Sequence, residues 1–152
     1  MLGKRHGHGR FRSDCEGVTY EGEWKNGQEH GMGVECFDGG DRYEGQWKHG
    51  SYSGRGVLCF ANGNRYEGGF LDNKEQGQGR LWFAGGSGSY EGEWLAGQRH
   101  GFGVERDAAN QIIFTGQWAY DKPVLDEVQQ NNVHEDATAD ERKLASSEIA
   151  SS

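Results

Sequence analysis

Histidines recur at one position of a repeating pattern, directly before a Gly-x-Gly sequence, and imidazole is a common metal ligand. They are His6, His30 and His100. If each repeat forms one β-hairpin, equivalent positions of neighbouring repeats lie about 10 Å apart, which is two strand spacings. Side chains at that separation do not converge on one ion. We therefore predict turn hydrogen bonding for these histidines, and no metal or cofactor.

The cysteines also occupy repeated positions. Cys36 and Cys59 are equivalent, and a rise of about 10 Å exceeds the Cα separation of about 7 Å that a disulfide tolerates. Cys15 falls in an expected turn. Three cysteines and no signal peptide favour free thiols in a reducing, cytoplasmic compartment.

Carboxylates form a ladder along one predicted face, with rungs at Glu21, Glu44, Glu67 and Glu91. Arg42 and Arg65 stand two positions before two of these glutamates, so they share the face and are expected to pair with them. Charges about 10 Å apart are largely screened at physiological salt. A solvated face is therefore favoured over an acidic recognition strip.

The sequence offers no constellation for catalysis. No group of acids, serine or cysteine stands apart from the repeats, and no Gly-x-x-x-x-Gly-Lys-Ser/Thr sequence occurs. The net charge is -8 and the chain has no basic stripe, which argues against nucleic acid as a partner. We predict a protein that is not an enzyme.

Five aromatic pairs, each spanning a central glycine, set the period of the chain. Successive pairs begin 23, 23, 24 and 24 residues apart. A period in this range indicates stacked supersecondary units, each too small to bury a hydrophobic face alone. The pairs are Tyr20 with Trp24, Tyr43 with Trp47, Tyr66 with Phe70, Tyr90 with Trp94, and Phe114 with Trp118.

Turn residues fall twice in each period. One turn contains Gly27, Gly50, Asn73 or Gly97, and asparagine is the residue that most readily replaces glycine at positive φ. The second turn precedes each new aromatic pair, as at residues 62–63. Each repeat is therefore predicted to be one antiparallel hairpin, and the chain an elongated all-β repeat array.

Both aromatics of a pair share one face of their strand, and the glycine between them has no side chain on that face. The gap is expected to accept a ring from the adjacent strand or repeat. We predict that the ten aromatics of the five pairs line an exposed groove that receives a segment of a partner protein.

A sharp boundary follows Tyr120, because all 27 glycines and every aromatic residue lie at or before it. We place the repeat array at residues 1–120 and an acidic segment at residues 121–152. Asp121 and Pro123 suit the start of a short capping helix, with Val124, Leu125 and Val128 at helical spacing. Residues 138–141 have capping-box form and predict a second helix start.

Together, the aromatic pairs and the Gly-x-Gly sequences resemble the MORN (membrane occupation and recognition nexus) repeat. Residues 43–47 and 97–103 fit its pattern closely, and the resemblance covers residues 3–118. It implies an antiparallel β-ribbon with an aromatic face, used mainly for protein contact. The chain resembles stand-alone scaffold members, which implies a cytoskeletal assembly, with the radial spokes or axoneme of a cilium or flagellum as the expected place.

The family name also implies a membrane alternative, in which clustered Lys and Arg bind anionic phosphoinositides. The best basic cluster comprises Lys4, Arg5, Arg10 and Arg12. The other basic residues are dispersed, so protein partners are favoured over membrane phospholipid.

The first hairpin is incomplete, because residues 3–9 align with residues 97–103 and no first strand precedes them. Its remaining strand, around residues 10–13, is predicted to be an open sheet edge. Three explanations stand side by side. Arg10 and Arg12 blunt the edge, a partner or second copy supplies the strand, or the start of the sequence is a fragment or mis-assigned.

Overall fold

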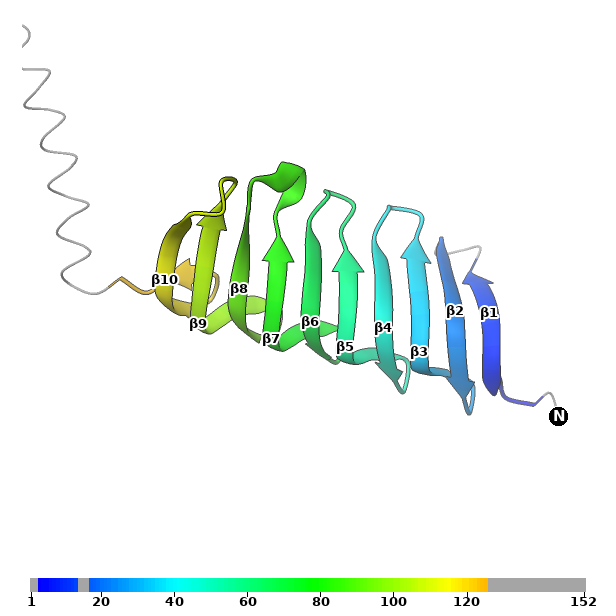
Figure 1. Ribbon diagram of the computed structural model, residues 1–152. Coiled ribbons are helices and arrows are strands. Elements are labelled where there is room, and N and C mark those ends of the chain that lie inside the picture. The colour runs from blue at the N-terminus through cyan, green and yellow to red at the C-terminus, as the bar shows by residue number, and fades with distance from the viewer. Residues whose placement is uncertain (1–2, 14–16, 126–152) are drawn as a thin grey trace, which may run out of the picture.

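The computed structural model describes residues 3–13 and 17–125, which form one antiparallel sheet of 11 strands. The spatial order of the strands follows the chain order, so the sheet is a long ribbon (Figure 1). This confirms the predicted all-β repeat array. The strands are β1 (Gly7–Ser13), β2 (Val18–Lys25), β3 (Gln28–Phe37), β4 (Arg42–Lys48), β5 (Ser51–Cys59), β6 (Arg65–Leu71), β7 (Lys74–Trp82), β8 (Gly88–Leu95), β9 (Gln98–Asp107), β10 (Ile112–Ala119) and β11 (Lys122–Pro123).

The tight turns have the predicted left-handed backbone. The φ angles of Gly27, Gly50, Asn73 and Gly97 are +86°, +79°, +67° and +88°. The residue before each of them also has positive φ, as at Asn26 with +54°. Two successive positive φ angles define a type I′ turn, whose twist matches that of the flanking strands.

A ladder of turn contacts ties each hairpin to the one before it. The backbone N–H of Gly27 donates to the carbonyl of Arg5 at 2.8 Å, and the same bond recurs at each later type I′ turn. Asn73 adds a side-chain contact, because its Oδ1 accepts from the backbone N–H of Tyr52 at 2.8 Å. Asn73 therefore adopts the left-handed conformation, as glycine does at the other turns, and adds a side-chain hydrogen bond between repeats that glycine cannot make.

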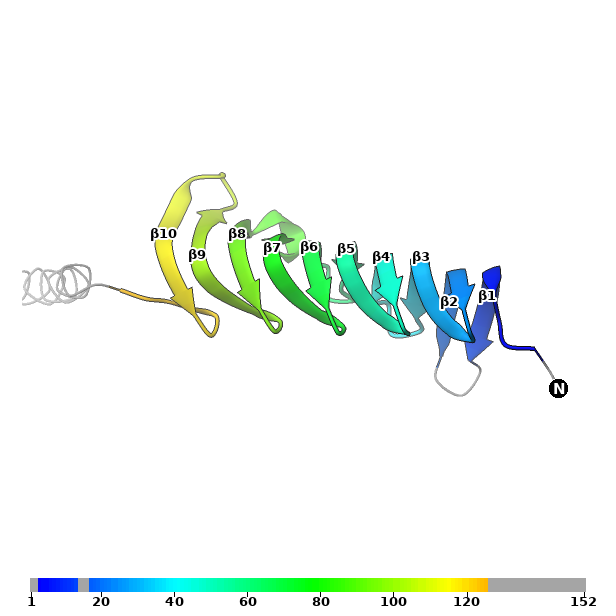
Figure 2. The same ribbon diagram turned by 90° about the horizontal axis from the view of Figure 1, so that it is seen from below.

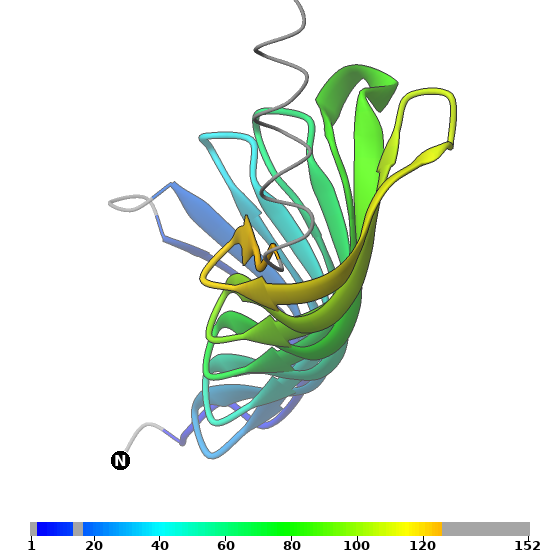
Figure 3. The ribbon, with the colours of Figure 1, turned by 90° about the vertical axis from the view of Figure 1, so that its left-hand side faces the viewer.

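Each hairpin bends sharply near its Gly-x-Gly sequence (Figures 2 and 3). The register between β2 and β3 shifts between Gly22 and Glu23, and Gly31 has φ of +61°. Beyond the bend, Tyr52 on β5 stacks on the ring of Tyr43 on β4, with centroids 3.7 Å apart and planes 7° apart. The aromatic pairs therefore lie inside the bend. We call this the inner face of the sheet, and the glutamate ladder lies on the outer face.

Glycines at the bend leave room for the tyrosine rings. A Cβ on Gly56 would lie 2.6 Å from Cε2 and 2.7 Å from Cζ of Tyr43, across the strand pair. A Cβ on Gly45 would lie 2.6 Å from Oη of the same ring. The slot beside Gly45 is thus filled by a ring from its own strand, whereas the sequence predicted a ring from the adjacent strand or repeat.

The predicted capping helix at Asp121 is wrong. Tyr120 and Asp121 have φ of +53° and +66° and form a fifth type I′ turn, which leads into β11. Asp121 repeats the contacts of earlier turns, since its N–H donates to the carbonyl of Arg99 at 3.1 Å and its Oδ1 accepts from the N–H of Arg99 at 2.9 Å. Aspartate is favourable both at a helix N-cap and in a left-handed turn. Here the contacts with Arg99 stabilise the turn.

The array therefore extends to Pro123, beyond the predicted boundary at Tyr120. Among the described residues the one helical segment is a 3-10 turn at Ala84–Gly86. Val128 and the capping box at residues 138–141 lie outside the described residues.

We expect Gly45→Ala to destabilise the fold by about 1–3 kcal/mol, because the new Cβ would lie 2.5 Å from Cα of Gly56. Urea denaturation followed by tryptophan fluorescence measures the change. Gly39→Ala is the matched control, since a Cβ there meets nothing within 4 Å. Equal unfolding midpoints for the two variants would contradict the prediction that position 45 has no room for a side chain.

Candidate interaction surface

The structure buries nine of the ten aromatics that were predicted to line an exposed groove. Their exposed fractions are 0–6%, and Phe114 alone is partly exposed. The prediction of an exposed aromatic groove is corrected accordingly: alternation identified the shared face, but the bend closes that face over the rings. The buried residues are Tyr20, Trp24, Tyr43, Trp47, Tyr66, Phe70, Tyr90, Trp94 and Trp118.

Edge-to-face contacts join the rings into one row. Tyr20 meets Trp24 of its own repeat at 5.1 Å and Trp47 of the next at 4.9 Å, between centroids. The pattern recurs along the array, and Tyr90 meets Trp118 at 5.0 Å. The polar tips are also bonded, since Tyr20 Oη donates to the carbonyl of Glu23 at 2.9 Å. The row is the core of the protein.

One position lies over the tyrosine ring from the far side of the bend, as Tyr52 does over Tyr43 and Arg99 does over Tyr90. It is the second residue after the type I′ turn and is occupied by Glu29, Tyr52, Glu75 or Arg99, to which Arg5 corresponds by alignment. The Arg99 guanidinium lies 5.6 Å from the Tyr90 centroid and 4.3 Å from that of Trp118. Sequence analysis missed this position because its residue type changes from repeat to repeat.

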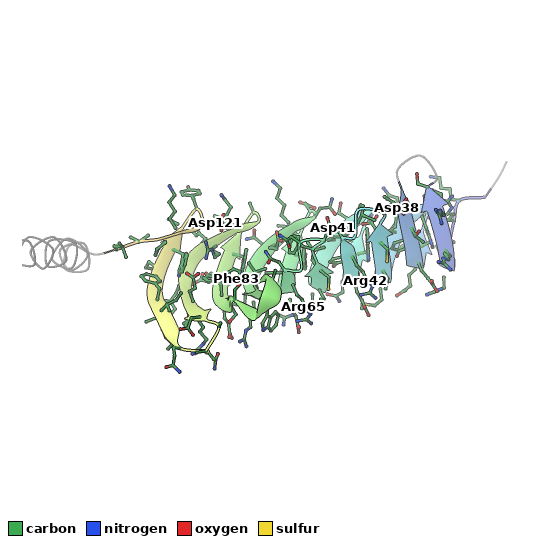
Figure 4. All side chains as sticks on the ribbon, turned by 90° about the horizontal axis from the view of Figure 1, so that it is seen from above. Asp38, Asp41, Arg42, Arg65, Phe83 and Asp121 are labelled. Atoms are coloured by element: carbon green, nitrogen blue, oxygen red, sulfur yellow. The ribbon has the colours of Figure 1, made fainter. Side chains whose placement is uncertain are left out.

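In the central part of the array, four apolar side chains are half-buried on the inner face and pack against the aromatic row. Leu58 lies opposite Tyr43 and Tyr66, and Leu81 lies opposite Tyr66 and Tyr90. Two phenylalanines follow these leucines at the next inward position. We call Leu58, Phe60, Leu81 and Phe83 the inner strip; Figure 4 labels Phe83. Alternation had placed Leu58 and Phe60 on this face, and continuing it to β7 would have found the other two.

Carboxylates flank the inner strip. Glu35 occupies on β3 the position that Leu58 has on β5, and its Oε2 accepts from Tyr52 Oη at 2.6 Å. Burial raises the pKa of Glu35 even though the Tyr52 hydrogen bond lowers it. Burial also raises the pKa of Glu75 on β7. The central inner face is therefore apolar, with acidic groups that are only partly solvated.

On the outer face, the predicted ion pairs are confirmed. Arg42 meets Glu44 at 2.6 Å and Arg65 meets Glu67 at 2.8 Å, and both arginines project from the same side of the sheet (Figure 4). All four side chains are 42–53% exposed, so each pair contributes about 0–1 kcal/mol. The pairs are consistent with a solvated face.

The basic residues predicted as a lipid patch do not converge. The Arg5 guanidinium lies over Phe11 and Trp24, at 4.2 and 4.8 Å from the ring centroids, on the inner face. Arg10 instead lines a hollow of ≈ 440 Å³ on the outer face, beside Glu21. Arg12, two residues after Arg10 on β1, shares the outer face with it, so Arg5 is separated from both. Lys4 lies beside the type I′ turn at Gly27, where an added Cβ would be 3.7 Å from the Lys4 Cβ.

The histidines and cysteines take separate positions along the array. The ring of His30 meets His49 edge-on at 5.8 Å, and His100 meets Tyr120 at 5.9 Å. No three metal-ligating side chains gather within residues 3–13 and 17–125. Cys36 and Cys59 carry free thiols, and Cys15 lies outside the described residues.

The hairpin periods coincide with a known repeat. A family model described as MORN repeat matches residues 1–14, 20–42, 43–65, 66–88 and 90–110. The chain belongs to the MORN repeat family. MORN repeats generally mediate protein–lipid or protein–protein interactions, and MORN repeat proteins are generally non-catalytic scaffolds.

Among curated proteins, no sequence matches this MORN repeat protein. Within its described residues, no helix has the length and hydropathy that a membrane span requires.

Ionisation of the tyrosines in the aromatic row should set the highest pH at which this MORN repeat protein stays folded. Burial raises the pKa of Tyr20 and Tyr90 from 10.0 to about 12. A phenol with a raised pKa contributes stability that is present below pH 10 and is lost as the pH rises toward 12. We expect phenolate absorbance and loss of the β-sheet circular dichroism signal to rise together. Ionisation of these tyrosines near pH 10 with the sheet intact would contradict their burial.

Glu75→Gln should stabilise this MORN repeat protein at neutral pH. Burial raises the pKa of Glu75 above 4.5, so the stability linked to its protonation is present below pH 4.5 and is lost as the pH rises through the raised value. The amide carries no charge to bury. Thermal melts at pH 7 and pH 4 should show a gain at pH 7 that disappears at pH 4. Glu21→Gln, on the exposed outer face, is the control; an equal gain from it would point to net charge instead.

Proposed function

We propose that this MORN repeat protein is a non-catalytic interaction scaffold that binds a segment of a partner protein along the inner strip. The inner strip carries the proposal. Its four apolar side chains stay half-buried although the aromatic row beneath them is closed. Partly exposed apolar surface rimmed by charge is typical of protein interfaces. The partner contacts the inner strip, and the buried rings hold the sheet in the shape that presents it.

The charges of the inner face favour a partner with apolar and basic side chains. Glu29, Glu35 and Glu75 lie on this face, and within the described residues none of them pairs with a lysine or arginine. A lysine or arginine from the partner would relieve their incomplete solvation. The segment therefore places apolar side chains on the inner strip and cations against the flanking carboxylates.

The family resemblance supports a place for this scaffold in a cytoskeletal assembly of the cytoplasm. A cilium or flagellum, with its axoneme and radial spokes, is the proposed site. Detergent extraction of native cells tests this placement. Retention of the chain in the detergent-insoluble fraction supports it, and complete release by detergent contradicts it.

Binding of anionic phosphoinositides is the second candidate function. The observation in its favour is that residues 1–13 contain four basic residues and no acidic one. The structure divides Arg5 and Arg10 between the two faces, which weakens a single lipid site. Protein binding is therefore the first proposal.

A photo-crosslinking amino acid at position 60 tests the protein proposal. Benzoylphenylalanine in place of Phe60 should crosslink to a protein in native extracts, and Glu35→Lys in the same chain should lower the yield at least severalfold. The matched control is the same replacement at Phe102, which is 53% exposed and lies outside the inner strip.

Equal crosslinking from positions 60 and 102 would contradict the inner strip as the binding surface. Binding only to phosphoinositide vesicles, abolished by Arg10→Glu, would replace the first proposal with the second.

A further inference from the structure

The hairpin formed by β6 and β7 differs from its neighbours at three positions of the outer face. Gly69 stands where β2, β4, β8 and β10 have glutamate or glutamine. Arg80 stands where β3, β5 and β9 have valine, and Trp82 stands where β3 and β5 have cysteine. Arg80 and Trp82 line a hollow of ≈ 260 Å³, together with Arg55, Glu67, Gln78, Gly79 and Glu91. Arg55 lies opposite Gly69 on β5 and Gln78 lies on β7, so the hollow extends over the glycine.

In three other hairpins, the side chain at the Gly69 position accepts a hydrogen bond from the backbone. The donor is each time the N–H of the middle residue of Gly-x-Gly, at 2.7, 2.7 and 2.9 Å. The acceptor and donor pairs are Glu23 with Met32, Gln46 with Arg55, and Glu93 with Phe102. Gln78 is the equivalent donor on β7, and within residues 3–13 and 17–125 no side chain accepts from its N–H.

The space that these acceptors occupy is open in the β6–β7 hairpin. In the three other hairpins, a Cβ on the first glycine of Gly-x-Gly would meet the accepting glutamate or glutamine side chain. A Cβ on Gly77, the equivalent glycine, would meet nothing within 4 Å. Position 69 does not accommodate a side chain of its own, because a Cβ there would meet the carbonyl oxygen of Gln76. A side-chain acceptor for Gln78 would therefore come from a ligand.

Two arginines beside this space are incompletely bonded. Arg55 is exposed, and its side chain forms no ion pair within the described part of the chain. The guanidinium of Arg80 lies 3.4 Å from Ser89 Oγ and 3.7 Å from Glu91 Oε2. Its buried Nε has no hydrogen-bond partner among the described residues. Both cations therefore retain hydrogen-bonding capacity for an added carboxylate, and charge-assisted hydrogen bonds of this kind are the strong ones.

The carboxylates that line the hollow already have cationic partners. Glu67 Oε2 lies 2.8 Å from a guanidinium nitrogen of Arg65, and the other carboxylate is the one beside Arg80. With Arg55, three arginines face two glutamates, so the local charge is positive. Trp82 forms one wall, and the guanidiniums of Arg65 and Arg80 lie 4.7 and 4.9 Å from its ring centroid. These cation–π contacts hold both arginines at the hollow.

We propose that this hollow binds a carboxylate, which an aspartate or glutamate side chain of a protein partner supplies. The carboxylate takes the place that the Glu23 carboxylate has in the β2–β3 hairpin, so it accepts from the N–H of Gln78. It lies between Arg55 and Arg80, which balance its charge. The site is on the outer face, away from the inner strip, and goes beyond the proposed function: one partner segment is acidic here, whereas the segment on the inner strip is basic.

Amide NMR spectra of the full chain test the proposal. The probe is the blocked peptide acetyl-Gly-Glu-Gly-amide, and acetyl-Gly-Gln-Gly-amide is its uncharged control. The glutamate peptide should move the amide proton of Gln78 downfield in a saturable way, and the glutamine peptide should bind about tenfold more weakly, because it lacks the charge. The amides of Met32 and Phe102 already donate to side chains of the protein, so they are internal controls and should not move.

Arg80→Val is the matched variant, because β3, β5 and β9 carry valine at this position of the same sheet. Arg80→Val and, at an exposed position, Arg55→Gln should each weaken the response of Gln78 to the glutamate peptide about tenfold. Arg42→Gln removes the same charge elsewhere on the outer face and should leave the response unchanged.

Three results would overturn the proposal. The first is a Gln78 amide that does not move, or that responds equally to both peptides. The second is an equal loss of binding in Arg80→Val and Arg42→Gln, which would show attraction to net charge alone. The third is saturation of the Gln78 shift by inorganic phosphate at lower concentrations than by the glutamate peptide, which would assign the hollow to a phosphate group.

Discussion

A tyrosine ring lying over two glycines is the contact on which the structure depends. In the second aromatic pair, Tyr43 occupies the space that Cβ atoms of Gly45 and Gly56 would need, and its Oη donates to the carbonyl of Gln46 at 2.8 Å. The glycines allow the hairpin to bend, and the bend closes the inner face over the ring. Burial of each ring contributes roughly 1.5–3 kcal/mol, a large share of the cohesion in a chain that is 33% hydrophobic.

The sequence alone was enough to predict the period, the hairpins and both sets of turns, because these depend on local backbone requirements. Asn73 is the clearest case, since it stands where φ is +67°. Curvature was harder to predict. Alternation assigned Tyr43 and Trp47 to one face, but it does not say that Tyr52 returns across the bend to cover them. At Asp121 the sequence-based prediction was wrong, because aspartate favours both a helix N-cap and a left-handed turn. Contacts with Arg99 in the preceding repeat stabilise the turn.

The two faces of the sheet in this MORN repeat protein carry different kinds of side chain. The inner strip consists of half-buried apolar groups and is flanked by carboxylates such as Glu35. The outer face carries ion pairs between residues close in sequence, such as Arg42 with Glu44, in which the two charges neutralise each other. Position in the fold therefore decides which aromatic and apolar side chains are buried in the core and which stay partly exposed.

Because the strands lie in chain order, the sheet pairs only neighbouring elements. A unit of 23 or 24 residues adds one hairpin, or about 10 Å of length, and contacts only the units on either side of it. Duplicating or deleting one unit of the gene would therefore change the reach of the protein in fixed steps and leave the remaining contacts intact. The number of aromatic pairs in the sequence therefore sets the length of the array.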